Sequence, residues 1–390
     1  MEVIINTSTN LYSWIIHPTG AIMEQNNKKK IAVVSVAVIV IAIAAVTIAV
    51  LSEDDDETNG PFNVVDGLGR TVNIESSNRI ASTSSLVTEF ICSLGEYSKL
   101  AGVTNDVNPL KVQDYLIGIP DDGFPQTIVS GLNNGTIKDI GPMYLISAES
   151  ILLSSPDLVI MGGYFNSDAT ISQLENMGIP VVICKDNSSI DNIYFNIELV
   201  GKVIGKESEA QKLVNQMRSA IGKIVDWTKS LDVERPSVGS FISLSTGTSG
   251  SYACGSKYIT GTRLIEMLGG TNAFSGIQGN YEVVSKESIA TVNPDVIISG
   301  SHSSTASTGE LELIKNDPVL KSISAIKNDR IYATFGTSSS AYTSTSHGFV
   351  NTVAFMAMFM YEDQLNFEMN NYMDNGYEVY LKLFWNQINS

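Results

Sequence analysis

The sequence contains few cysteine, histidine and basic residues, and each shortage excludes a class of protein. Among 390 residues there are three cysteines and three histidines, and 41 acidic residues outnumber 24 basic ones, which gives a net charge of −17. Three cysteines cannot staple a small disulfide-rich domain. The acidic balance argues against binding to nucleic acid or to anionic lipid. A hydrophobic content of 43% is enough for real cores, and the length predicts two or three domains.

The motifs of common enzymes are also absent. There is no G-x-x-x-x-G-K-[ST] phosphate loop, and residues 67–69 lack the third glycine and the following helix of a dinucleotide fingerprint. Residues 247–250 do not have the spacing of a serine-hydrolase elbow. His302 and His347 are far apart, and no cysteines form a C-x-x-C pair. The sequence therefore predicts no enzyme, no catalytic residue, no cofactor and no metal held by protein ligands.

One long apolar run is present, over residues 31–51. It contains no charged residue, Asn, Gln, Gly or Pro, and as a helix it would cover roughly 30 Å of hydrocarbon. Lysines 28–30 precede it and acidic residues 53–57 follow it, so the positive-inside rule places the N-terminus in the cytoplasm. We expect a single-pass membrane anchor with the rest of the chain extracytoplasmic. A cleaved secretory signal is the alternative, although its apolar region is normally shorter.

The segments that flank this run are not expected to fold. Residues 1–22 are either a short cytoplasmic tail or the result of a misplaced start, since Met23 followed by a polar, lysine-rich stretch would make a compact beginning. The acidic run 53–57 lacks the spaced ligands of a calcium loop and is expected to be a solvated spacer.

After residue 60 the hydrophobic pattern alternates between short strands and helices. Residues 62–74 predict a small hairpin around Asp-Gly. Residues 79–82 predict a strand that leads into a helix over 86–94, which Gly95 ends. Two apolar runs, 156–161 and 179–184, are typical of buried parallel strands in βαβ units. Cys92 and Cys184 lie in apolar runs and are expected in the core.

A long amphipathic helix is predicted over residues 206–231, because apolar residues recur there at helical spacing with charges between them. Strand and helix signals then resume. The predicted elements are strands at 238–244, 296–299 and 331–335 and helices at 262–268 and 347–361. The pattern therefore predicts an α/β protein with two lobes and one long connecting helix.

The sequence repeats one element internally. Residues 147–160 match residues 285–298 without a gap, 138 residues apart, and the shared positions include Glu149 and Glu287 as well as a Pro-Asp pair before each strand. Convergence of helix-turn-strand junctions is one explanation. The other is that two lobes share one topology and carry this element once each.

These features together resemble the metal-chelate class of ABC-transporter substrate-binding proteins, whose members capture ferric siderophores, haem or cobalamin. The resemblance runs from Phe62 to the end of the chain. It rests on the order and spacing of residues 65–72, 79–82, 88–89, 94–95 and 102–103, the two Pro-Asp strands, and residues 268–272 and 326–332. It implies two Rossmann-like lobes, joined by the long helix, with ligand held between them. It also implies an ABC permease dimer with its ATPase as partner.

The expected division of the chain follows from these observations. It comprises a cytoplasmic tail (1–30), a transmembrane anchor (31–51), an acidic linker (52–61), an N-terminal α/β lobe (62–205), a connecting helix (206–232) and a C-terminal α/β lobe (233–390). We expect a monomer, bound to the cell membrane by its N-terminal helix, that carries a small metal chelate and no nucleic acid. The alternative function is a tethered sensor or receptor ectodomain of the same fold that does not serve transport.

Candidate ligand residues lie in loops that follow strands, because ligands of open α/β lobes sit beyond the carboxyl ends of the strands. These loops are 83–85, 162–166, 245–258, 299–304 and 335–347. Aromatic rings in such loops suit a flat macrocycle, and a Tyr or His side chain can complete an iron coordination shell. The full set of predicted ligand residues is Ser84, Ser85, Tyr144, Tyr164, Phe165, Tyr252, Tyr258, Tyr281, Tyr342 and His347.

Tyr144, Tyr281 and His347 belong to this set for reasons of their own. Tyr144 and Tyr281 are included because each precedes the repeated glutamate of its lobe, a region that lines the cleft in the family that the chain resembles. His347 could equally cap a polar loop at the start of a helix. Arg263 is the nearest basic residue, and the absence of an arginine cluster slightly favours neutral or weakly charged chelates, including corrinoids.

The repeated glutamates have a separate predicted role. In the family that the chain resembles, one acidic residue per lobe at the position of the repeated glutamate forms ion pairs with arginines of the two permease subunits. The resemblance therefore implies that Glu149 and Glu287 dock on the permease. A pseudo-symmetric protein meets a symmetric dimer through matched patches. The alternative is that each glutamate only stabilises the first turn of its own helix.

Overall fold

The computed structural model describes residues 60–105, 124–163, 167–245, 247, 250–256, 261–300, 308–334, 348–369 and 377–390. All of them belong to one compact unit, Gly60–Ser390. The predicted anchor at 31–51 lies outside the described residues. Among the helices that the structure does describe, none combines the length and apolar character that a bilayer crossing requires.

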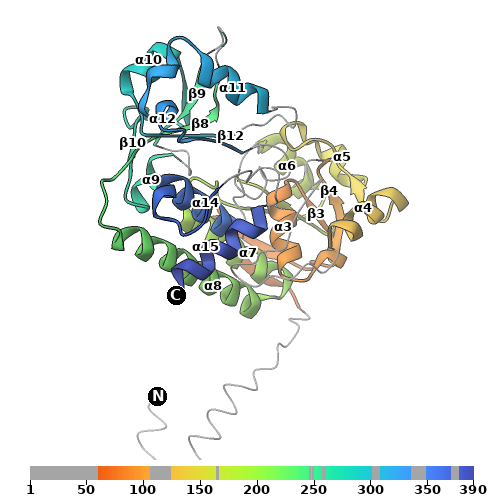
Figure 1. Cartoon of the computed structure of the whole chain (residues 1–390). Coiled ribbons are helices and arrows are strands. Elements are labelled where there is room, and N and C mark those ends of the chain that lie inside the picture. The colour runs from red at the N-terminus through yellow and green to blue at the C-terminus, as the bar shows by residue number, and fades with distance from the viewer. Residues whose placement is uncertain are drawn as a thin grey trace, which may run out of the picture. The chain divides into compact units, whose positions relative to one another are not determined.

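The first lobe is built on a five-stranded parallel sheet (Figure 1). Its strand order is β5-β4-β3-β6-β7, and every neighbouring pair is parallel. The strands are β3 (Ile80–Ser82), β4 (Leu100–Val103), β5 (Lys138–Asp139), β6 (Leu158–Met161) and β7 (Val181–Ile183). The helices are α3 (Ser85–Ser93), α4 (Phe124–Asn134), α5 (Ala148–Leu152), α6 (Asp168–Asn176) and α7 (Ile190–Ile204).

The second lobe has a six-stranded mixed sheet of order β11-β9-β8-β12-β13, with β10 also paired to β8. The strands are β8 (Ser237–Ser243), β9 (Ser251–Cys254), β10 (Thr271–Asn272), β11 (Tyr281–Val284), β12 (Val296–Gly300) and β13 (Ile331–Thr334). The helices are α9 (Thr262–Met267), α10 (Lys286–Val292), α11 (Thr308–Asn316), α12 (Ser324–Lys327), α14 (Phe349–Met360) and α15 (Tyr377–Ile388). The two strands β9 and β11 pair antiparallel with each other.

The internal repeat occupies equivalent places in the two sheets. Its strand is β6 in the first lobe, between β3 and β7, and β12 in the second, between β8 and β13, with parallel pairing on both sides. The Pro-Asp aspartates also act alike. Asp157 accepts a hydrogen bond from the Arg79 backbone N–H at 2.9 Å, and Asp295 accepts one from the Ser237 N–H at 2.9 Å. Each aspartate thus fixes the chain at the start of a strand, β3 in the first lobe and β8 in the second.

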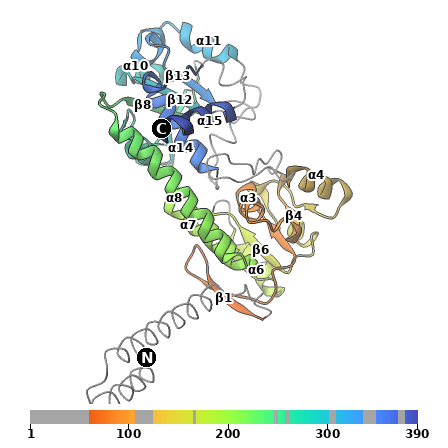
Figure 2. The same cartoon turned by 60° about the horizontal axis from the view of Figure 1, so that its bottom comes forward.

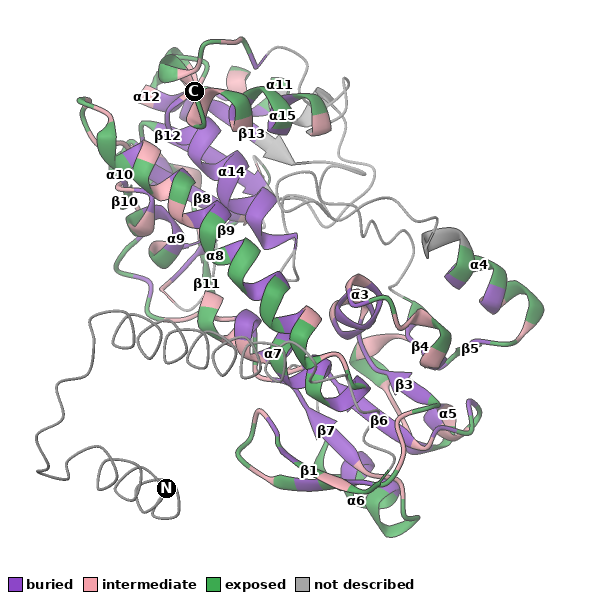
Figure 3. Ribbon diagram, turned by 90° about the horizontal axis from the view of Figure 1, so that it is seen from below, coloured by how far each residue is buried: buried purple, intermediate pink, exposed green. Residues whose placement is uncertain are grey.

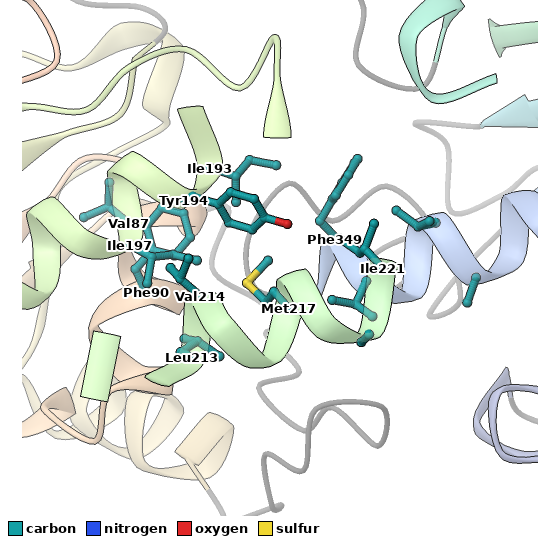
Figure 4. Close-up of a cluster of buried hydrophobic side chains, with 14 of the residues drawn as sticks. Val87, Phe90, Ile193, Tyr194, Ile197, Leu213, Val214, Met217, Ile221 and Phe349 are labelled. Carbon is teal, nitrogen blue, oxygen red and sulfur yellow. The ribbon is translucent and has the colours of Figure 1, made fainter. Parts of the chain in front are cut away.

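The long helix predicted from the apolar stripe is α8 (Glu207–Ser230). It lies against α7 and continues towards α14 (Figure 2). Its buried residues Leu213, Val214 and Met217 face the buried residues Tyr194 and Ile197 of α7 (Figure 4). Further along, Ile221 lies near Phe349 of α14 (Figure 4). One hydrophobic core therefore contains residues of both lobes and of the helix that joins them.

The colouring in Figure 3 shows how burial follows the two sheets and α14. Strands β3, β4, β6 and β7 are buried at every position, as expected for a parallel sheet covered on both faces. All residues of α14 are buried as well, which explains its apolar sequence. Edge strand β11 is different, because three of its four residues are exposed.

A partly buried ion pair fastens the N-terminal hairpin of β1 (Phe62–Val65) and β2 (Thr71–Ile74) to the first lobe. The Asp66 side chain is fully buried and accepts hydrogen bonds from the Nε and Nη2 atoms of Arg70 at 2.9 and 2.8 Å. Arg70 Nη2 also donates to the Val181 carbonyl at 2.8 Å, and the Gly67 N–H donates to the Ile183 carbonyl at 2.6 Å. The Asp-Gly hairpin predicted from sequence therefore docks on the edge strand β7.

The three cysteines are buried and form no disulfide, as predicted for Cys92 and Cys184. Burial, together with the nearby Asp66 charge, raises the pKa of the Cys184 thiol to about 12. Because the thiolate is the reactive form, Cys184 of the folded protein should react slowly with thiol reagents at pH 8, and burial shields the other two thiols. We expect Ellman's reagent to label native protein very slowly and all three thiols after unfolding in guanidinium chloride. Rapid labelling of Cys184 in native protein would contradict this assignment.

Candidate functional site

The carboxyl ends of β3 and β6 meet at the start of α3. Thr83 and Ser84 follow β3 and are buried, and the Ser84 hydroxyl accepts a hydrogen bond from the Val87 N–H at 3.4 Å as the N-cap of α3. Gly162 follows β6, and a Cβ atom there would lie 2.8 Å from the Ser84 Oγ. Ser85, the first residue of α3, is half-buried. The two predicted serines thus lie at the carboxyl edge of the sheet, and Ser84 also caps the N-terminus of α3.

The loop after β7, residues 184–189, also lies at this edge of the sheet, and it was missing from the loops predicted to hold ligand. Asp186 accepts hydrogen bonds from the Ser188 hydroxyl at 2.6 Å and from the Asn192 side-chain amide at 2.9 Å. The side chain of Asn196 accepts from the Lys185 N–H at 2.7 Å and donates to the Lys185 carbonyl at 2.9 Å. The signal was present in the sequence, since the predicted strand 179–184 ended just before this loop.

A basic side chain from the second lobe reaches this loop. Arg263 of α9 donates from Nη1 to the Ser188 carbonyl at 3.5 Å. Partial burial acts to raise the pKa of Asp186, but hydrogen bonds from Ser188 and Asn192 and the charge of Arg263 outweigh it and lower the pKa. Asp186 is therefore ionised at neutral pH, and a cation of one lobe faces an anion of the other.

Only part of the predicted aromatic set lies among the described residues. Tyr252 and Tyr281, on the paired strands β9 and β11, are brought together with their ring centroids 5.6 Å apart in an edge-to-face arrangement. Tyr144 is 64% exposed and lies in the other lobe. Five predicted ligand residues fall outside the described residues: Tyr164, Phe165, Tyr258, Tyr342 and His347.

The repeated glutamates occupy matched, exposed positions in the two lobes. Glu149 lies in the first turn of α5 behind the N-cap Ser147, and Glu287 lies in the first turn of α10 behind the N-cap Ser285. Hydrogen bonds from its own backbone N–H and from Ser285, with the charge of Lys286, lower the pKa of Glu287. Glu287 therefore carries its charge at neutral pH.

A recess lies at the other end of the second sheet, before the first residues of its parallel strands. This cavity of about 220 Å³ is lined by residues that precede β8, β12 and β13, among them Arg235 and Arg330. Arg235 donates to the Thr228 carbonyl at the end of α8, and Arg330 donates to the Phe359 and Met360 carbonyls at the end of α14. Both arginines thus satisfy helix carbonyls, which is a structural role.

The described residues contain no group of three or more His, Cys, Asp or Glu side chains able to hold a metal ion.

Comparison with protein families identifies the family to which this fold belongs. The model of the periplasmic binding protein family matches residues 80–335, well over half of the chain. The chain belongs to this family.

Two curated relatives have names that describe a function. An uncharacterized ABC transporter substrate-binding lipoprotein of Bacillus subtilis, YvrC, is 26% identical over 281 residues, covering 70% of this chain and 77% of its own. A cobalamin-binding protein of Halobacterium salinarum is 25% identical over 224 residues, covering 57% of this chain and 56% of its own. The latter match thus spans about half of that relative.

Several solved structures share the fold. The periplasmic heme-binding protein RhuT from Roseiflexus sp. RS-1 aligns with a TM-score of 0.58 and 22% identity, covering 74% of this chain and 99% of its own. A possible iron-binding periplasmic protein of Staphylococcus epidermidis aligns with a TM-score of 0.56 and 23% identity, covering 73% of this chain and 98% of its own. At these identities the likeness shows the fold, and the two-lobe arrangement predicted from the sequence agrees with it.

Proposed function

We propose that this chain is an extracytoplasmic substrate-binding protein that captures a metal chelate, such as an iron siderophore, haem or cobalamin, and delivers it to an ABC importer. The observation that carries this proposal is the repeated element with one exposed glutamate in each lobe. Membership of the periplasmic binding protein family supports it, as do relatives named for ABC transport and for cobalamin binding.

The ligand is proposed to bind beyond the carboxyl ends of the parallel strands, where Ser84 and Ser85 begin α3. The predicted residues Tyr164, Phe165, Tyr258, Tyr342 and His347 belong to loops after such strands and remain proposals. The described geometry adds Arg263, which contacts the loop after β7. A ligand carboxylate or other anionic group would compete with Asp186 and Ser188 for this arginine.

We further propose that residues 31–51 anchor the protein in the cell membrane as a single helix and that the acidic linker 52–61 separates the anchor from the binding lobes. The run of lysines before the apolar segment and of acids after it supports this orientation. The two lobes, 62–205 and 233–390, and the connecting helix 206–232 would then act outside the cytoplasm as a monomer.

Delivery to the importer is proposed to depend on Glu149 and Glu287. Two exposed carboxylates at repeat-equivalent positions suit a partner whose two subunits are related by a two-fold axis and each present a basic side chain. The structural alternative, a glutamate that stabilises its own helix start, predicts no effect beyond that helix.

The ligand class can be tested by absorbance titration of the purified full chain, in detergent, with haem, with cobalamin and with ferric siderophores. We expect one of these chelates to bind with a dissociation constant of about 1 μM or lower. Glucose and an amino-acid mixture, followed by calorimetry, serve as controls and should not bind. Binding of only a sugar or an amino acid would overturn the proposed ligand class.

A further inference from the structure

An exposed aliphatic side chain stands four residues before the proposed docking glutamate of each lobe. Leu145 precedes Glu149 and is 72% exposed, and Val283 precedes Glu287 and is 55% exposed. The two aliphatic residues are 138 residues apart, as the glutamates are, so they are equivalent in the internal repeat. Four residues span at most about 14 Å of extended chain. The Cα atoms of each aliphatic residue and its glutamate are therefore at most about 14 Å apart.

The backbone holds Leu145 and Val283 in place by different means. Leu145 ends a short 3-10 turn, η3 (Met143–Leu145), and its N–H donates to the Pro142 carbonyl at 2.9 Å. Val283 lies on strand β11, opposite Tyr252 of β9 in the antiparallel ladder. In both lobes the serine N-cap of the following helix comes two residues later. The same side-chain chemistry at the same spacing on two unlike backbones is not required by the fold.

An aromatic residue accompanies each aliphatic one. Tyr144 is next to Leu145 and is 64% exposed. Tyr281 is 50% exposed and lies on the same face of β11 as Val283, because alternate residues of a strand share a face. Tyr252 belongs to that face as well and contacts Tyr281. Scattered single apolar residues are ordinary on a protein surface, whereas apolar groups clustered beside charge indicate an interaction site.

We infer that these residues form two docking patches for the two subunits of the permease dimer: Tyr144, Leu145 and Glu149 in one lobe, and Tyr281, Val283 and Glu287 in the other. The aliphatic and acidic members are equivalent in the repeat, whereas the tyrosines stand one position apart in it. The inference rests on the delivery function proposed above. The occupant is a two-fold partner that presents a basic side chain beside an apolar one on each subunit, because acid and apolar surface are repeated together. The apolar contacts supply affinity, and the charge pair directs and orients the encounter.

Two of the predicted ligand residues thereby take a different role. Tyr144 and Tyr281 belong to the docking patches and contact the permease rather than the chelate. The ligand is then held by the loops after the strands, around Ser84 and Arg263.

The decisive experiment compares two double variants of the full chain. Leu145→Ser with Val283→Ser removes both aliphatic contacts. Leu153→Ser with Val292→Ser is the matched control. These residues are also exposed, but they lie at the C-terminal ends of α5 and α10, away from the glutamates in the first turns. Each variant is titrated against the permease–ATPase complex that the wild-type chain stimulates, reconstituted in nanodiscs, and ATP hydrolysis is measured. We expect the half-maximal concentration to rise about tenfold or more for the first variant and less than about twofold for the control.

The outcomes separate the inference from the function on which it rests. If the wild-type chain stimulates the ATPase and the Leu145/Val283 variant does so equally well, the inference is wrong and the glutamates can still dock. An equal loss in the control variant would also overturn it. If the wild-type chain with its chelate stimulates no importer of its organism, the delivery function itself fails.

The tyrosine assignment has its own test. Tyr144→Ala with Tyr281→Ala should weaken ATPase stimulation about tenfold and leave chelate affinity unchanged. Loss of chelate affinity with normal stimulation would return these tyrosines to the ligand site.

Discussion

Replacement of both Glu149 and Glu287 by arginine is expected to abolish chelate uptake while ligand affinity and melting temperature stay nearly unchanged. Both side chains are exposed, so their loss leaves no buried group without a partner. If basic residues of the permease meet these positions, two like-charge contacts replace two attractive ones, and such changes at close charge pairs cost about 2–5 kcal/mol each. The measurement is uptake of labelled chelate by cells that express the variant as their only copy.

A matched control distinguishes docking from local helix stability. Asp168 and Glu207 are also exposed acids in the first turns of helices, α6 and α8, but they have no place in the repeat. Their replacement by arginine loses the same favourable interaction with the helix ends, about 0.3–1 kcal/mol each, and should leave uptake normal. Normal uptake by the Glu149/Glu287 variant would exclude docking through these residues. A variant that fails to fold would favour the helix-stabilising role.

Removal of the buried Asp66 carboxylate is expected to destabilise the protein far more than removal of an exposed carboxylate. Asp66→Ala leaves the Arg70 guanidinium without its principal partner and frees the Leu68 and Arg70 N–H groups that donate to Asp66 at 3.0 Å. Breaking a fully buried pair by removing one partner costs about 3–5 kcal/mol, and because the Arg70 side chain is 33% exposed we expect a cost near the lower end, about 3 kcal/mol. Urea denaturation followed by circular dichroism measures the change. Hydrogen exchange at residues 62–74 shows whether the hairpin detaches first.

The second partner of Arg70 provides the control for this prediction. Glu175 contacts Arg70 Nη1 at 3.0 Å, but its side chain is 44% exposed. Solvent screens such a pair, so Glu175→Gln should cost less than about 1 kcal/mol. If Asp66→Ala were no more destabilising than Glu175→Gln, the partly buried pair would not be what fastens the hairpin.

Local sequence signals were sufficient for the elements that bury a regular apolar pattern. The connecting helix predicted at 206–231 is α8, and the strands expected at 156–161 and 179–184 are β6 and β7 in the predicted parallel arrangement. The repeat also predicted that one helix-turn-strand element would recur in both sheets. These elements are specified by hydrophobic periodicity and by N-cap serines, which act over a few residues.

Other features depend on contacts between distant residues and left no local signal. Strand β11 has four residues and is mostly exposed, so it buries no apolar face that its sequence could reveal, and it is a strand because β9 supplies its hydrogen bonds. The contact between Arg263 and Ser188 joins residues 75 positions apart. Likewise, the sequence alone could not show that Leu145 and Val283 are exposed, because exposure depends on how distant segments pack. Their equal spacing from the glutamates was visible in the repeat.

The covering of α8 by late segments of the chain has a consequence for biogenesis. Trp227 of α8 packs edge-on against Tyr361 and Phe384, with ring centroids 6.2 and 5.0 Å apart. Helices α14 and α15 both contact α8, and they are the last two helices of the sequence. Helix α7 covers the first part of the apolar side of α8, but the part around Trp227 therefore stays uncovered until nearly the whole chain has been made. Until then the connecting helix would present this surface to chaperones, and a chain cut before residue 349 would keep it exposed to quality-control proteases.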